Sequence, residues 1–229
     1  MGGIGLTETD KIKTKDLFLS VPPFLSELFG GAVYPWEIVE KIKDFVGILV
    51  NLNPCGFEKY SKNVLIGSGV KISKTAEIEG DAVIGNDVEI RSGAYLRGGV
   101  IVCDGCVIGN STELKNCIVL PRAQLPHYNY VGDSIIGSGA HLGAGAICSN
   151  LKSDKKSVFV RGEKSYETGL RKLGAIVGDG AEVGCGSVLC PGAVIGRNAV
   201  IYPLSLVRGV VKENSILKSE GKIVARKMN

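Results

Sequence analysis

The fold is decided by residues 65–120, which read LIGSGVKISKTAEIEGDAVIGNDVEIRSGAYLRGGVIVCDGCVIGNSTELKNCIVL. Every sixth residue from Ile66 to Leu120 is aliphatic, and glycine often follows it. A period of six is neither the helical period of about 3.6 nor the strand period of two. It predicts a parallel β-helix, in which each hexad forms one short strand and a corner with its aliphatic side chain inside. Three hexads make a triangular coil, and successive coils lie about 4.8 Å apart.

The hexad pattern is interrupted twice further along the chain. After Leu120 the spacing fails, and the pattern is expected to resume at Tyr130, so the segment 121–129 is expected to leave the stacked core. Past Cys148 the pattern is absent until Val177. The intervening segment is polar and basic and is too long for a corner, so it predicts a projecting loop or hairpin. Such a segment is either a solvated excursion or an arm that reaches a neighbouring subunit or a phosphate.

The N-terminal part has apolar spacing typical of helices over 16–28 and 36–52. These helices are expected to cap the open end of the coil, because the terminal coils of a solenoid need covering. The predicted fold class is all-β, a left-handed parallel β-helix with a short N-terminal helical cap and a projecting loop. The predicted divisions are an N-terminal helical cap region at 1–63, the β-helix at 64–211 with an insertion at 149–175, and a C-terminal tail at 212–229.

Composition narrows the classes of function. The net charge of +4 over 229 residues permits anionic substrates but does not indicate nucleic-acid binding. Among seven cysteines, Cys103 and Cys106 form a lone CxxC pair without a second pair, so no metal site is expected. Free cysteines suit a reducing, cytoplasmic setting. No signal peptide or apolar run of membrane-spanning length is recognised in the sequence, so no membrane partner is expected.

Two features indicate a ligand site before any family is considered. His127 lies in the interrupted segment, and a residue outside the stacked core can face a ligand. Arg97 and Lys115 are one full coil apart, so they should stack at one edge. Two cations about 5 Å apart repel by roughly 1 kcal/mol or more at an intermediate dielectric, which a shared phosphate would relieve. The alternative is that the two side chains splay apart into solvent.

Several segments together resemble a known family, the acetyltransferase half of the bifunctional N-acetylglucosamine-1-phosphate uridylyltransferase / glucosamine-1-phosphate N-acetyltransferases. The similarity is closest to the archaeal-type sugar-1-phosphate nucleotidylyltransferases that carry the same coil. The segments that carry it are Leu96-Arg97, Glu113-Leu114-Lys115, His127–Asp133, Gly143-Ala144-Gly145, Ser149-Asn150 and Thr168–Asp179. The Gly-rich nucleotide signature of the nucleotidylyltransferase domain is not found, so no nucleotidylyltransferase activity is expected from this chain alone.

The resemblance implies catalytic roles. His127 matches the general base, which takes a proton from the sugar's 2-amino group; an imidazole suits that task near neutral pH. The backbone N–H of Ala144 matches the donor to the oxyanion that forms on the acetyl group. The co-substrate implied is acetyl-CoA, which the family contacts at positions matching Ala144, Cys185 and Pro203. No metal is implied.

The resemblance also implies substrate contacts. Arg97 and Lys115 match a phosphate clamp, which agrees with the stacking argument. His141 stands where the bacterial enzymes carry a sugar-binding Asn, so the identity of the sugar stays open. The remaining substrate-binding positions implied are Tyr130, Asn150 and Lys156. A basic residue near the C-terminus also contacts coenzyme A in the family, with Lys222 and Arg226 as candidates.

The reading favoured is an acetyl-CoA-dependent N-acetyltransferase of an amino-sugar 1-phosphate that works as a cytoplasmic homotrimer. One alternative is a non-catalytic scaffold or regulatory subunit that docks a separate nucleotidylyltransferase through the N-terminal helices. Another is a hexapeptide acyltransferase for a different small amine or hydroxyl acceptor. A γ-type carbonic anhydrase needs three His ligands, and the chain has only His127 and His141.

Overall fold

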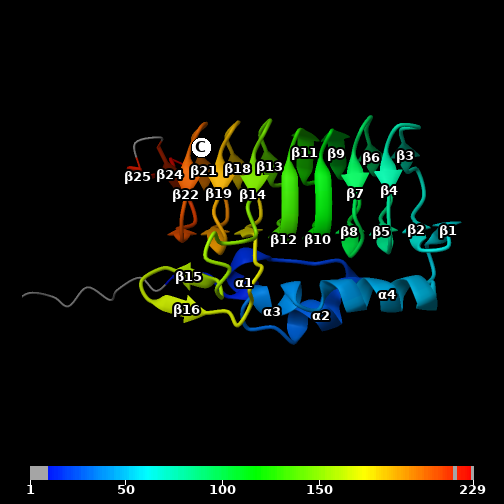
Figure 1. The fold of residues 1–229 in the computed structure, drawn as a ribbon, viewed down its shortest axis with the longest axis horizontal. Helices are drawn as coiled ribbons and strands as arrows, with labels where there is room; N and C mark the ends of the chain where they lie inside the picture. Colours follow the sequence, from blue (N-terminus) through cyan, green and yellow to red (C-terminus); the bar gives the residue numbers. More distant parts are fainter. Residues whose placement is uncertain (1–9, 219–220, 228–229) are drawn as a thin grey trace, which may run out of the picture.

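A computed structural model describes residues 10–218 and 221–227. Residues 1–9, 219–220 and 228–229, which belong to the predicted N-terminal region and C-terminal tail, lie outside the described residues. The described chain forms the predicted left-handed parallel β-helix, an elongated stack of coils along which helices and a hairpin lie (Figure 1).

Each coil before the last contributes one strand to each of three faces, and strands on one face pair in parallel. Strands β10 and β12 run round a corner and serve two faces. Face 1 consists of β2 (Val64–Ile66), β5 (Ala82–Ile84), β8 (Val100–Val102), the second halves of β10 (Glu113–Val119) and β12 (Tyr130–Ile136), β17 (Ala175–Val177), β20 (Ala193–Ile195) and β23 (Val210–Val211). Face 2 consists of β3 (Lys71–Ile72), β6 (Glu89–Ile90), β9 (Val107–Asn110), β11 (Gln124–His127), β13 (His141–Leu142), β18 (Glu182–Val183), β21 (Val200–Ile201) and β24 (Ser215–Leu217). Face 3 consists of β4 (Glu77–Ile78), β7 (Tyr95–Leu96), the first halves of β10 and β12, β14 (Ile147–Cys148), β19 (Val188–Leu189) and β22 (Leu206–Val207).

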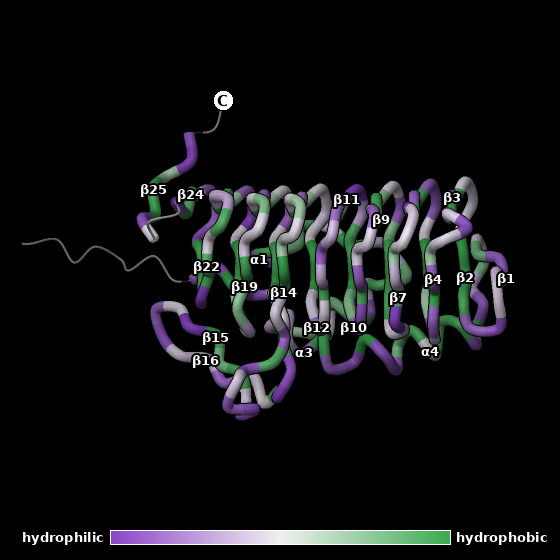
Figure 2. Tube along the Cα trace, turned by 45° about the horizontal axis from the view of Figure 1, so that its top comes forward, coloured by the Kyte–Doolittle hydropathy of each residue, from purple (hydrophilic) through white to green (hydrophobic). Residues whose placement is uncertain are grey.

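The interior of the coil is one column of stacked aliphatic side chains per face. In Figure 2 the hydrophobic colour recurs from coil to coil, for example along β14, β19 and β22. The predicted inward residues from Ile66 to Leu114 belong to this core or pack against it, and so do Ile136, Leu142 and Cys148. Burial of these rows from water is the main stabilising contribution to the fold, at roughly 25 cal/mol per Å² of apolar surface.

The register differs from the prediction between Leu114 and Val131. The next aliphatic residue of the coil core after Leu114 is Val119, five residues on, while Leu120 belongs to a second cluster outside the coil. The pattern then continues through Leu125 to Val131, so Tyr130 does not point inward as predicted. The segment 121–129 therefore stays in the stack, and β11 within it pairs with its neighbours in both directions. The prediction failed because Val119 and Leu120 are both aliphatic and both buried.

The N-terminal helices lie along face 1, below the strands in Figure 1, and do not cap the open end of the coil as the sequence analysis expected. The helix expected over 16–28 is interrupted near Pro22-Pro23, and the one expected over 36–52 divides after Val39. Proline ends helices because it lacks an N–H and restricts the preceding residue. The helical elements are α1 (Thr14–Leu17), the 3₁₀ turn η1 (Pro23–Leu25), α2 (Ser26–Gly30), α3 (Trp36–Val39) and α4 (Ile42–Leu52).

Face 1 is apolar on both sides, which explains where the helices pack. The middle residue of each face-1 strand except the two-residue β23 points outward and is nevertheless aliphatic and buried, forming a second core with Trp36, Ile38 and Ile42 of the helices. Strands that are covered on both surfaces have continuous apolar sequences, without the alternation of apolar and polar residues that half-exposed strands show. The outward row consists of Leu65, Val83, Ile101, Ile118, Ile135, Ile176 and Val194.

The insertion between β14 and β17 forms a hairpin of β15 (Phe159–Arg161) and β16 (Ser165–Glu167), which lies beside the helices (Figure 1). Val158 and Val160 are fully buried in the second core, so this segment is docked on the molecule and does not project freely. At the two ends of the stack, β1 (Glu58–Ser61) pairs antiparallel with β2, and β25 (Ile223–Ala225) pairs antiparallel with β24.

Replacing Ile101 by Ala tests the position of the helices. Ile101 points away from the coil interior and is fully buried beneath them, so its truncation should lower the free energy of unfolding by about 2–5 kcal/mol. The matched control is Leu52→Ala, at the exposed end of α4, which should change it by less than about 0.5 kcal/mol. Urea denaturation of both variants measures the difference, and equal small losses would contradict this packing.

Candidate active site

Arg97 and Lys115 stack at the edge between face 3 and face 1. Each follows an inward leucine, and those leucines pair between β7 and β10. Arg97 Nη1 donates to Glu113 Oε1 at 2.8 Å, so a carboxylate already compensates one cation. Lys115 has no side-chain partner among the described residues. The repulsion between the two cations is therefore already partly relieved by Glu113, and Lys115 is the cation left open to an anion.

The same edge holds a polar network at the two shortened corners. Asn116 Nδ2 donates to Asp133 Oδ1 at 2.8 Å and to the Val39 carbonyl of α3 at 3.3 Å. Asn150 Nδ2 donates to the other carboxylate oxygen of Asp133, which is buried. Asn116 and Asp133 both adopt left-handed backbone conformations, with φ of 46° and 48°. The two amides thus hold Asp133 beside Lys115, whose strand pairs with Gly132.

Tyr130 begins β12 and points outward on face 3. It pairs with Glu113 of the preceding coil and with Ile147 of the following one. Burial raises the pKa of the Tyr130 phenol, with the negative charges of Glu113 and Asp133 adding to the shift, while a hydrogen bond with Asn150 opposes it. The phenol is therefore neutral at physiological pH and can donate a hydrogen bond. Arg97, Glu113, Lys115, Tyr130 and Asn150 form one polar surface, which we call the cationic edge.

The second group of predicted residues lies at the other edge of face 3, where face 2 ends. The strand register aligns His127 with Ala144, Ala144 with Cys185, and Cys185 with Pro203. The four residues therefore form one column along the coil axis, which we call the histidine edge. The resemblance implied a role for each of these residues separately, and the register of the coils aligns them in one column.

Ala144 has the backbone geometry of a donor site. Its carbonyl accepts from the Gly186 N–H at 2.8 Å, while its own N–H donates to no acceptor in the part of the chain that the structure describes. Backbone N–H groups are strong donors that are rarely left unpaired. This one lies half-buried in the coil after His127, where it can receive a developing oxyanion.

His127 ends β11 with its side chain exposed. Its backbone pairs with Asn110, and its N–H donates to Asn129 Oδ1 at 3.2 Å. Asn129 is buried and donates in turn to the Gly143 carbonyl at 2.8 Å, which braces the corner. The reason given from the sequence was wrong, because His127 belongs to the strand lattice. Its imidazole is exposed because the strand ends there.

Two predicted residues lie away from both edges. His141 is exposed on face 2, where it pairs with Gln124 and Glu182. Lys156 lies in the insertion, exposed and ahead of β15. No hydrogen bond or ion pair links either side chain to the cationic edge within one copy of the chain. Of the two C-terminal candidates, Arg226 is held by Glu182 and the Asn198 carbonyl, and Lys222 is exposed.

Sequence reasoning assigned no role to Glu113, Asn116 or Asp133. Glu113 and Asp133 stood within segments used for the resemblance, and the spacing of Asn116 and Asp133 by one shortened coil is visible in the sequence. A pattern defined only by aliphatic residues at every sixth position does not detect polar residues at the corners. A search for polar residues repeating at coil spacing would have found this network.

The cysteines are suited to packing more than to ligation. Burial raises the pKa of the Cys106 and Cys148 thiols to about 12, so neither forms a thiolate at neutral pH. Across residues 10–218 and 221–227, no group of three or more His, Cys, Asp or Glu side chains is placed to hold a metal ion. The helices described there are all too short or too polar to cross a membrane.

Comparison with protein families identifies the repeat. A model described as bacterial transferase hexapeptide (six repeats) matches residues 62–98, 81–116 and 174–209. These ranges cover coils on both sides of the insertion, so the coil is built from the repeat typical of that family.

Curated relatives extend the similarity to much of the chain. The protein named "Bifunctional protein GlmU" of Methanococcus maripaludis (strain S2) is 32% identical over 200 residues, which are 86% of this chain and 49% of that protein. The "Bifunctional sugar-1-phosphate nucleotidylyltransferase/acetyltransferase" of Sulfurisphaera tokodaii is 37% identical over 180 residues, 76% of this chain and 44% of that protein. The chain thus spans about half the length of these relatives. The "Putative uncharacterized acetyltransferase YaiX" of Escherichia coli K12 is 37% identical over 145 residues, 63% of each chain.

A solved structure with similarity to this chain is that of a point mutant of AntD, an N-acyltransferase from Bacillus cereus, in complex with dTDP-4-amino-4,6-dideoxyglucose and coenzyme A. It has a TM-score of 0.44 and 20% sequence identity, and the match covers 78% of this chain and 88% of that one.

Proposed function

We propose that this hexapeptide-repeat protein is an acetyl-CoA-dependent N-acetyltransferase that acts on an amino-sugar 1-phosphate. The observation that carries the proposal is the histidine edge, where an exposed imidazole and an unpaired backbone N–H stack in successive coils. The cationic edge lies across the same face and offers Lys115 to an anion. Relatives whose names include a sugar-1-phosphate nucleotidylyltransferase/acetyltransferase support this substrate class.

In the proposed reaction the sugar amine attacks the thioester carbonyl carbon. The N–C bond forms while His127 accepts a proton from the amine nitrogen. The carbonyl oxygen becomes an oxyanion facing the Ala144 N–H, and a preorganised donor of this kind is typically worth about 10²–10³-fold in rate. The C–S bond then breaks, and the proton held by His127 passes to the departing sulfur. The products are an amide and a free thiol, so atoms and charge balance.

The coenzyme would lie along the histidine edge beyond Ala144, beside Cys185 and Pro203. Successive positions there are about 4.8 Å apart, which suits an extended chain running parallel to the coil axis. The sugar would lie across face 3 near Tyr130, with its amine towards His127 and its phosphate towards Lys115. Glu113 limits the net charge of the clamp, because it pairs with Arg97.

A homotrimer belongs to the proposal for two reasons. His141 and Lys156 lie outside both edges of one copy, so they would reach the substrate only from a neighbouring copy. Exposed apolar residues also lie near the C-terminal end of the stack, with Leu204 of the corner before β22 at 81% and Leu206 of β22 at 61% exposed. Such residues clustered on one surface are typical of an interface.

One observation weighs against the scaffold alternative. It relied on the N-terminal helices for docking a partner, yet Ile38, Val39, Ile42 and Val46 are buried in the second core with face 1. The apolar side of these helices is therefore already covered by the chain itself.

Removing the base should lower turnover without unfolding the protein. His127→Ala should reduce kcat by about 10²–10⁴-fold, because a general base typically contributes that much. Activity should recover partly as pH rises, since solvent then supplies more free amine. The control is His141→Asn, which should alter sugar preference and retain turnover. Near-normal kcat of His127→Ala at neutral pH, measured by thiol release, would refute the assignment.

Substitutions at the cationic edge should weaken binding of the substrate's phosphate group and leave binding of the sugar itself unchanged. Lys115→Ala should raise KM for glucosamine 1-phosphate by about ten- to a hundredfold, as expected for a lost charged hydrogen bond. Arg97→Ala should do the same and also leave the Glu113 carboxylate uncompensated, so Arg97→Ala/Glu113→Gln should regain part of the loss. Unphosphorylated glucosamine should respond little to any of these changes. Equal losses on both substrates would exclude a clamp.

Assembly can be measured directly. Light scattering should give about three times the mass of one chain, and Leu204→Asp should shift it towards one chain mass by placing a charge in the interface. Leu19→Asp is the control, because Leu19 is exposed in the N-terminal segment. A wild-type monomer at micromolar concentration would disprove the interfacial site.

A further inference from the structure

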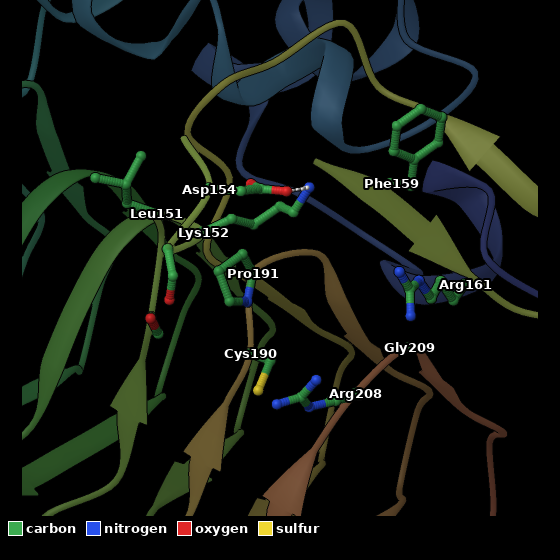
Figure 3. Close-up of a pocket in the computed structure, with 11 residues that line it drawn as sticks. Leu151, Lys152, Asp154, Phe159, Arg161, Cys190, Pro191, Arg208 and Gly209 are labelled. Atoms are coloured by element: carbon green, nitrogen blue, oxygen red, sulfur yellow. Dashed lines mark ion pairs between the residues drawn. The ribbon is translucent and has the colours of Figure 1, made fainter. Parts of the chain in front are cut away.

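A pocket that neither edge accounts for lies between the hairpin of the insertion and the C-terminal coils (Figure 3). Its volume is about 430 Å³, within the range of small-molecule sites. One wall comes from β15 and the segment that precedes it, and the other from the corners after β19 and β22. The lining residues are Ser149, Leu151, Lys152, Ser153, Asp154, Phe159, Arg161, Cys190, Pro191, Arg208 and Gly209.

The pocket carries uncompensated positive charge. Lys152 is paired with Asp154, with Nζ and Oδ2 at 3.2 Å. Arg161 and Arg208 approach the pocket from opposite walls in Figure 3, and neither side chain has an ion pair or hydrogen bond with another described residue. Guanidinium groups bind phosphate through paired, charge-assisted hydrogen bonds. Two of them at one pocket favour an anion with more than one phosphate oxygen.

The two arginines are held in place by close backbone packing. Gly209 has φ of +78°, and a Cβ there would lie 2.2 Å from the Arg161 carbonyl oxygen. A Cβ at Gly192 would lie 2.7 Å from Val158 Cγ1. These glycines let the hairpin rest directly on the coil, and Val158 and Val160 anchor it in the second core. The backbones that carry Arg161 and Arg208 are therefore fixed relative to each other before any ligand binds.

The pocket also has an apolar side. Phe159 is 41% exposed and Leu151 is 40% exposed, although both line a concave surface, and Pro191 lies beside Cys190 in Figure 3. Aromatic rings bind planar bases by stacking, at about 1–3 kcal/mol per base. A ligand that combines a flat ring with phosphate groups would use both parts of the pocket.

The pocket is distinct from the cationic edge. Lys115, Gly132, Ser149, Cys190 and Arg208 occupy successive positions along one corner of the coil. Four steps of about 4.8 Å place Lys115 roughly 19 Å from Arg208 along the axis. The insertion leaves the coil between them, so one sugar phosphate cannot reach both.

We propose that this pocket is a nucleotide-binding site, in which Arg161 and Arg208 hold the phosphates and Phe159 and Leu151 contact the base. The shared chemistry is a base joined to a diphosphate, and both the adenosine end of coenzyme A and a nucleotide-linked sugar present it. The site does not depend on the proposed acetyl transfer, because binding alone defines it.

Calorimetric titration of the full chain with ADP, UDP, coenzyme A and pyrophosphate tests the site. At least one nucleotide should bind, and Arg161→Ala and Arg208→Ala should each weaken it about tenfold or more. Phe159→Ala should weaken nucleotides and leave pyrophosphate unchanged. The matched control is Arg171→Ala, an exposed arginine of the same insertion that does not line the pocket. It should bind as the wild type does.

The pattern of losses identifies the source of the ligand. Weakening of ADP and coenzyme A with UDP unaffected would assign the pocket to the coenzyme, and the reverse would assign it to a nucleotide-linked sugar. Melting temperatures close to wild type would establish that the variants fold. Nucleotide affinities unchanged in both Arg161→Ala and Arg208→Ala, no binding at millimolar nucleotide, or binding of pyrophosphate as tight as that of every nucleotide would overturn the proposal.

Discussion

The structure depends on the stacking of inward aliphatic side chains from one coil onto the next. That stack allows little variation in register, because a shift of one residue would turn a polar side chain into the core. Positions outside the core are therefore aligned just as strictly. His127, Ala144, Cys185 and Pro203 are spread over four coils, yet the core places them in one column. The same constraint aligns Lys115 with Arg208. The residues proposed to act in catalysis and binding are thus positioned by a core that they do not belong to.

The two shortened corners are the places where the constraint is relaxed. Between Leu114 and Val119, and again between Val131 and Ile136, a corner has one residue fewer than the usual hexad. Asn116 and Asp133 make these tight turns with positive φ, which short polar side chains tolerate better than most. Their side chains then bond to each other across the coils. Tight turning and a polar network thus occur together beside the cationic edge.

The sequence was sufficient to predict the β-helix, but it was not sufficient to predict what packs against it. The period of six identified the β-helix because an inward aliphatic position recurs in every strand. It gave the wrong register after Leu114 because covered strands are apolar at neighbouring positions, so Val119 and Leu120 could not be told apart by type. Arg97 and Lys115 stood out by their spacing of one coil and His127 by the interrupted pattern around it, and the resemblance then implied a role for each. Glu113, which pairs with Arg97, and Asp133, which accepts from Asn116 and Asn150, act through contacts between coils and have no signature along one strand.

The helices on face 1 have a consequence for how the molecule unfolds. A bare solenoid has contacts only between neighbouring coils, so its stability is a sum of local contributions and its ends can fray separately. Here α4 lies against β5, β8 and β10, and the Asp179 carboxylate further along the stack accepts from the Leu19 N–H at 2.8 Å. One N-terminal segment therefore spans coils that do not touch each other. Because this segment contacts several coils at once, the coils should unfold more cooperatively than those of a bare solenoid. Their backbone amides should therefore lose protection from hydrogen exchange together.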